Sequence, residues 1–126
     1  MNAALTARLV AAGRIGFGLA LIASPERLTA PWLGEDAGRA GTRVVTRGLG
    51  ARDLALGAGA LAATESELRP WVAAAILADT ADLVATVAAG KSLPLAGRLL
   101  VAAVASGGAA LGVVAFAGLP ARSTRA

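Results

Sequence analysis

Five ionisable residues stand near the middle of apolar stretches, and they are the residues of this chain best suited to chemistry. They are Arg14, Arg52, Asp53, Asp79 and Asp82. Asp79 and Asp82 are three residues apart, so on a helix they share one face. Two such carboxylates can share a proton, because both do not ionise cheaply where the dielectric constant is low. Asp79, Asp82 and Asp53 are therefore the candidate proton donors or relays.

Other catalytic chemistry is excluded by residue types that the chain lacks. It has no Cys, no His and no Tyr, so thiol or imidazole nucleophiles, Ser-His-Asp triads, haem ligation by His or Cys and the usual zinc sites are ruled out. We expect no metal and no cofactor. Gly90-Lys91-Ser92 is like the end of a phosphate-binding loop, but Ala85 stands where that loop needs its first glycine.

The elements that position these charges are apolar and long. The 126 residues are 56% hydrophobic and 16% charged, against about 25% charged in a typical soluble domain, and the mean hydropathy is +0.68. Four apolar stretches cover residues 5–23, 44–63, 71–89 and 99–119. Each is close to the roughly 20 residues that a helix needs to cross a membrane. We predict an all-α protein: one integral membrane domain of four transmembrane helices, with both termini on one side.

Two other organisations are less compatible with the sequence. The first stretch could be a signal peptide, but it is long and three further stretches follow, which favours a retained helix. A soluble Ala-rich bundle would need charged outer faces, and residues 99–119 hold no charge. The chain is therefore expected in the cell membrane as a multi-pass protein.

Charges at mid-depth must face the interior of the bundle and pair, since each isolated one costs at least about 2.5–3.5 kcal/mol. With Arg47, which lies nearer a helix end, three basic and three acidic residues form the predicted polar network or ligand pocket: Arg14, Arg47, Arg52, Asp53, Asp79 and Asp82. We expect Arg52 or Arg14 to bridge to Asp79 or Asp82, and Asp53 to meet Arg14 or Arg47. The neighbours Arg52 and Asp53 should point in different directions and not pair.

The third stretch shows how such a helix divides into an inner and an outer face. The two carboxylates share their face with Ala75, Ala78 and Thr86, whereas the opposite side, suited to lipid, carries Ile76, Leu77, Val84 and Val87.

Small residues at four-residue spacing predict close helix packing or, as the alternative, a homodimer contact. They occur as Gly108 and Gly112 in the fourth stretch, and in the second as Ala51, Ala55, Gly59 and Ala63.

The connections fit four antiparallel helices. Ser24-Pro25-Glu26 is a typical helix start, which predicts a short interfacial helix that Pro31 ends near Trp32. Pro70 opens the third stretch in the same way. Trp32 and Trp71 then fall at opposite membrane faces. Residues 121–126 form a small polar tail.

The net charge of +4 does not indicate nucleic-acid binding, because the twelve basic residues form no dense run and only two Phe and two Trp could stack on bases. Scattered Arg in an apolar chain is typical of contact with lipid headgroups. Membrane lipids are thus the expected partners, with a membrane protein or a second copy of the chain as further candidates. The basic residues divide almost evenly between the two faces, so orientation is undecided.

Residues 47–57, RGLGARDLALG, and the run Ala78-Asp79-Thr80-Ala81-Asp82 after Trp71 are distinctive. With Pro25 and Trp32-Leu33-Gly34, they resemble small four-helix membrane proteins of high-GC bacteria, a group of hypothetical proteins and domains of unknown function. The resemblance covers residues 14–101 and implies the four-helix membrane fold, with no reaction or substrate. Small multidrug exporters share only the number of spans, since Arg14 replaces the membrane-embedded Glu of their first helix.

Three functions follow as hypotheses. The leading one is a non-enzymatic accessory or lipid-binding membrane component, whose Arg/Asp network shapes the bundle or lines a polar pocket. The second is a membrane-embedded enzyme of isomerase or cyclase type, acting on a lipophilic substrate with an Asp as proton donor. The third is a proton-coupled exporter of small molecules. Whether the network is structural or functional is left open by the sequence.

Overall fold

The protein is built from helices joined by short turns, as a computed structural model of residues 2–121 shows. The residues described hold no strand, and the predicted all-α class is confirmed. The α-helices are α1 (Ala3–Ala23), α2 (Pro25–Leu33), α3 (Ala40–Ala62), α4 (Leu68–Ala89) and α5 (Leu95–Gly118). Single 3₁₀ turns η1 (Gly34–Gly38), η2 (Glu65–Glu67) and η3 (Gly90–Ser92) link them. Most of the predicted polar tail lies outside the described residues.

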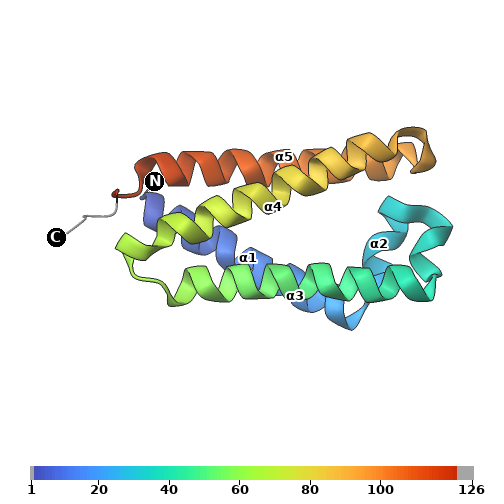
Figure 1. The fold of residues 1–126 in the computed structure, drawn as a ribbon, viewed down its shortest axis with the longest axis horizontal. Helices are drawn as coiled ribbons and strands as arrows, with labels where there is room; N and C mark the ends of the chain where they lie inside the picture. The colour runs from blue at the N-terminus through green and yellow to red at the C-terminus, as the bar shows by residue number, and fades with distance from the viewer. Residues whose placement is uncertain (1, 122–126) are drawn as a thin grey trace.

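The four long helices run in alternate directions, so that α1 begins and α5 ends at the same end of the molecule (Figure 1). α1 packs along α3, and α4 packs along α5. α1 also contacts α5, whereas α3 has much less contact with α4. At the end away from the termini the α1–α3 pair and the α4–α5 pair spread apart, and α2 lies there (Figure 1).

The helix starts agree with the sequence, but one predicted stop is wrong. Pro25 occupies the first turn of α2, and α4 begins at Leu68, next to the predicted start. Pro31 does not end α2: it lies inside the helix, which continues to Leu33. The chain leaves the helix at Gly34, whose φ of 62° is a conformation that glycine adopts without steric cost.

Three helices are long and apolar enough to cross a membrane: α1, α4 with its flanking turns, and α5. α3 runs as one helix through the predicted second stretch and has the necessary length, but it does not qualify on composition. It carries four charged side chains, those of Arg43, Arg47, Arg52 and Asp53. A bundle of four membrane-crossing helices therefore stays a prediction.

The outer surface is apolar. Large aliphatic side chains are exposed on every long helix, and on α4 the exposed fractions of Leu77, Val84 and Val87 are 71%, 61% and 66%. These three residues are on the face predicted to suit lipid. Ile76, predicted on the same face, instead packs inward against Gly112 of α5. A surface of this kind is costly in water and suits a hydrocarbon environment.

The packed core occupies the half of the molecule that holds the ends of the chain, which we call the closed half. Its buried residues come from all four long helices and are mostly small: Ala4, Ala7, Ala11, Ala60, Ala63, Leu68, Val72, Ala115 and Leu119. With alanine at most of these positions the helix backbones approach closely, a type of packing common in membrane proteins.

Glycines set the closest approach between α1 and α3. A Cβ atom on Gly18 would lie 2.5 Å from the Gly50 carbonyl oxygen, and one on Gly57 would lie 2.6 Å from that of Ala11. The small residues that pack on α1 are therefore Gly50 and Gly57. The row predicted from Ala51 packs only in its second half: Ala51 and Ala55 are exposed, whereas Gly59 lies against Trp71 of α4 and Ala63 is buried in the core.

In α5 the predicted glycine pair packs within the chain. Gly112 lies against Ile76 of α4, and Gly108 lies against the carboxylate of Asp79. The close spacing thus serves the α4–α5 contact.

Candidate functional site

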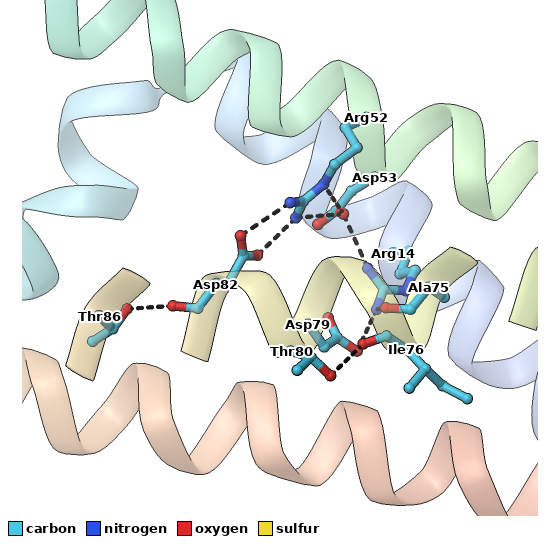
Figure 2. Close-up of polar contacts among 9 residues, drawn as sticks. All are labelled: Arg14, Arg52, Asp53, Ala75, Ile76, Asp79, Thr80, Asp82 and Thr86. Carbon is cyan, nitrogen blue, oxygen red and sulfur yellow. Dashed lines mark hydrogen bonds and ion pairs between the residues drawn. The ribbon is translucent and has the colours of Figure 1, made fainter. Parts of the chain in front are cut away.

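The five mid-depth charges form one continuous chain of alternating sign across three helices (Figure 2). Arg14 of α1 lies at its centre: Nη1 donates to Asp53 Oδ1 of α3 at 3.0 Å, and Nη2 donates to Asp79 Oδ2 of α4 at 2.5 Å. Asp53 Oδ1 also accepts from Arg52, which in turn binds Asp82 of α4. The predicted bridges from the two arginines to the α4 carboxylates are confirmed, as is the contact between Arg14 and Asp53.

Arg52 differs from its prediction. Both of its terminal nitrogens donate hydrogen bonds to Asp82, Nη1 to Oδ1 at 3.0 Å and Nη2 to Oδ2 at 2.7 Å. Its Nε and Nη2 also donate to Asp53 Oδ1 at 3.3 and 3.2 Å. The expectation that these sequence neighbours do not pair is wrong, because the long Arg52 side chain bends back along α3 and reaches the shorter carboxylate.

Arg47 does not join the network. It is exposed, and its Nε donates to the carbonyl oxygen of Ile22 at the end of α1, at 3.3 Å. The reason is helical geometry: at about 100° per residue, five residues place Arg47 roughly 140° around α3 from Arg52. Its inclusion in the predicted network is therefore wrong.

The backbone contacts described above place the charges. Arg14 and Asp53 each lie about one turn from the glycines of the α1–α3 crossing, Gly18 and Gly50, so the two side chains meet across a short gap. On the other side, a Cβ at position 108 would lie 2.6 Å from Asp79 Oδ2. Gly108 therefore leaves the space that the carboxylate of Asp79 occupies.

Burial differs along the network. The side chains of Arg14, Asp53 and Asp79 retain 10%, 7% and 13% exposure, whereas those of Arg52 and Asp82 retain 31% and 27%.

With every group ionised, two guanidinium groups face three carboxylates, which leaves one net negative charge. Asp53 Oδ2 and Asp79 Oδ1 accept no hydrogen bond from residues 2–121. The arrangement can thus accept further hydrogen bonds or one cation.

A cavity of about 500 Å³ adjoins all five charged residues, in the half of the molecule that holds α2, which we call the hollow half. Apart from the charges its walls are almost entirely apolar. Around its mouth α1, α2 and α5 contribute exposed side chains, whereas α3 and α4 contribute no exposed residue. The exposed apolar lining includes Phe17, Leu28, Leu100 and Val104.

Most of this lining has no signature in the sequence, because an apolar residue beside a cavity looks the same as one beside lipid.

Trp32 was expected only at the membrane surface. It is indeed at the opposite end of the molecule from Trp71, since the backbone of Trp32 lies against Gly97 near the start of α5 and the ring of Trp71 lies against Gly59 near the end of α3. Trp32 also lines the cavity, a role that its position in the sequence does not reveal.

The acidic residues do not form a metal site. Among residues 2–121, no group of three or more His, Cys, Asp or Glu side chains could hold a metal ion. The guanidinium groups of Arg14 and Arg52 lie between the carboxylates, in the positions where a metal ion would have to be shared by them (Figure 2).

Comparison with protein-family models, with curated proteins and with solved structures gave no match. The resemblance to small four-helix membrane proteins therefore stays a prediction, and the site is interpreted from its own geometry.

Proposed function

We propose that this protein is a four-helix membrane protein that binds a small amphipathic molecule in the cavity of its hollow half. The observation that carries the proposal is the cavity itself, about 500 Å³ with apolar walls and an Arg/Asp network at one side. Ligand pockets commonly have this volume and combine apolar walls with a few convergent polar groups.

The membrane setting is supported by the surface and by the length of the helices. α1, with 21 residues, spans about 30 Å, the thickness of the hydrocarbon core. α3 crosses beside it in this proposal. Its central charges are neutralised inside the protein by Arg14 and Asp82, and its outward face presents Val44 and Val45. The side chain of Arg47 on α3 contacts the end of α1 and in this way reaches the level of the headgroups.

The charge of the network selects the head of the ligand. One net negative charge and two carboxylate oxygens without a donor favour a head that is positively charged and donates hydrogen bonds, such as an ammonium group. The apolar walls favour an alkyl or ring body. A lipophilic amine therefore fits better than a fatty acid, whose carboxylate would be repelled by Asp53, Asp79 and Asp82.

Thermal unfolding of the purified protein in mild detergent tests this proposal, with dodecylamine and dodecanoate as probes. A ligand that binds only the folded state raises the unfolding temperature, and we expect this from dodecylamine alone. Val101→Phe, in the cavity wall, should remove the shift. Val113→Phe, on the exposed surface of the same helix, is the matched control and should retain it. Equal shifts with both probes, or a shift that survives Val101→Phe, would contradict the proposal.

A second function has one observation in its favour. Asp79 lines the cavity with an oxygen that accepts no hydrogen bond from residues 2–121, as a proton donor to a bound lipophilic substrate would. In that case the protein is an isomerase or cyclase rather than a binding protein. Asp79→Asn should then abolish turnover of the substrate while the protein still folds. Export coupled to protons has no comparable feature to support it and stays a hypothesis from the sequence.

A further inference from the structure

A second hollow, separate from the cavity, lies where α1 ends, α2 begins and α3 passes. It has a volume of about 370 Å³, and three of its seven lining residues are arginines: Arg27, Arg43 and Arg47. We call it the arginine corner. Glu26 is the one acidic residue in its lining, so the corner carries two net positive charges.

The charges of the arginine corner are poorly neutralised by the protein. Arg43 Nη1 lies 3.7 Å from Glu26 Oε2, and both side chains are about half exposed, so this pair contributes little. Arg27 and Arg47 have no carboxylate within 4.0 Å among residues 2–121. Three like charges around one hollow repel each other unless an anion lies between them.

Other donors face the same hollow. Ser24 lines it, and its hydroxyl makes no hydrogen bond that caps α2. The Nε of Arg47 is held by the Ile22 carbonyl, which fixes the side chain across the corner. Guanidinium groups, a hydroxyl and a helix start together are the donors that bind phosphate oxygens.

The position of the corner indicates where the phosphate comes from. α1 is long and apolar enough to cross a membrane and ends at Ala23, which lines the corner. The corner therefore lies at the membrane boundary, where phospholipid headgroups are. Val44 and Val45 of α3, exposed by 69% and 65%, follow Arg43 and present apolar surface at the level of the corner.

We propose that the arginine corner binds the phosphate headgroup of an anionic phospholipid. Its partner is a lipid of the surrounding membrane, held at the surface of the protein. This inference does not depend on the ligand of the cavity.

Native mass spectrometry of the full-length protein in detergent tests the proposal, with phosphatidylglycerol and phosphatidylcholine as probes. We expect phosphatidylglycerol to be retained preferentially. The double variant Arg27→Gln/Arg47→Gln should lower its affinity by about fivefold for each arginine removed. Arg39→Gln is the matched control. Arg39 is an exposed arginine at the same end of the molecule, and it pairs with Asp36 outside the corner.

Several results would overturn the proposal. One is equal retention of the two lipids, and another is an equal loss of phosphatidylglycerol affinity in Arg39→Gln. A third is displacement of the lipid by millimolar inorganic phosphate, which would indicate a site for the free ion. Glu26→Gln keeps the test decisive if the double variant fails to fold. It removes the one acidic group from the corner and should strengthen binding of phosphatidylglycerol. Dodecylamine binding, measured in the same variants, should not change.

Discussion

The closed half and the hollow half contain the same four long helices but are filled differently. In the closed half, alanines such as Ala7, Ala11 and Ala115 let the backbones approach until almost no space remains. In the hollow half the helix pairs spread apart around α2 (Figure 1), and about 500 Å³ stays open. The difference indicates that tight packing at one end fixes the fold, whereas the other end leaves the space that the proposed ligand would fill.

The Arg/Asp network lies at the boundary of the two halves. Arg14 lines both the large cavity and a cavity of about 20 Å³ in the closed half. Its bonds join α1, α3 and α4 where the tight packing ends. The network therefore holds the helices together at the point where side-chain packing no longer does.

The largest expected effect follows from removing Arg14. Arg14→Ala leaves Asp79 without its ion-pair partner and Asp53 with Arg52 alone. Loss of one partner from a buried pair costs about 3–5 kcal/mol, so the free energy of unfolding in detergent should fall by that amount. Arg47→Ala, the exposed control, should change it by less than about 1 kcal/mol. Equal effects would mean that the network does not join the halves.

Two buried alanines of α5 give an intermediate effect and test the comparison directly. Ala115 is 1% exposed in the closed half, and Ala105 is 6% exposed beside the large cavity. Ala115→Leu should destabilise the protein by about 1–3 kcal/mol through overpacking. Ala105→Leu can extend into open space, so we expect a change within about 1 kcal/mol and weaker dodecylamine binding. Thermal unfolding of the two variants compares them, and a similar loss in both would show that the halves are equally packed.

The smallest expected effect concerns the outer rim of the closed half. The guanidinium of Arg69, at the start of α4, lies 4.2 Å from the ring centre of Phe116 in α5. Arg69→Ala should cost about 0.5–1 kcal/mol, as is typical of an exposed cation–π contact. Dodecylamine binding should stay the same. A change in that binding, measured by the thermal shift, would mean that the closed half controls the hollow one.

The sequence predicts the ion pairs well where the energetic cost of an unpaired charge decides the position of a side chain. The cost of an isolated charge in an apolar layer required Arg14, Arg52 and the two α4 carboxylates to face inward, and the structure pairs them as expected. Arg47 was assigned to the network wrongly because basic and acidic residues were matched by number alone. The rotation of the helix, which points Arg47 away from Arg52 on α3, was not considered. The pairing of Arg52 with Asp53 was missed because spacing along a helix describes where side chains start, not how far a flexible arginine reaches.

The hollow half could not be predicted, because it results from how whole helices cross. The crossing of α1 and α3 is set at Gly18 and Gly50, where the backbones touch. In a sequence with 16 glycines, these two do not differ from Gly48, where an added Cβ atom would meet nothing within 4 Å. Helix positions were foreseen from hydropathy, whereas the space between the helices depends on contacts between residues far apart in the chain.

The alternating charges also bear on how the protein is made. In the proposed four-helix membrane protein, synthesis from the N-terminus would deliver Arg14 to the membrane before either of its acidic partners exists. α3 would then bring Arg52 and Asp53, so the unfinished α1–α3 hairpin would carry one surplus positive charge among its central residues. α4 adds Asp79 and Asp82 and reverses that sign. Both arginines would therefore gain their α4 carboxylates only when this helix joins the bundle, which would make α4 the step that commits the nascent chain to its final structure.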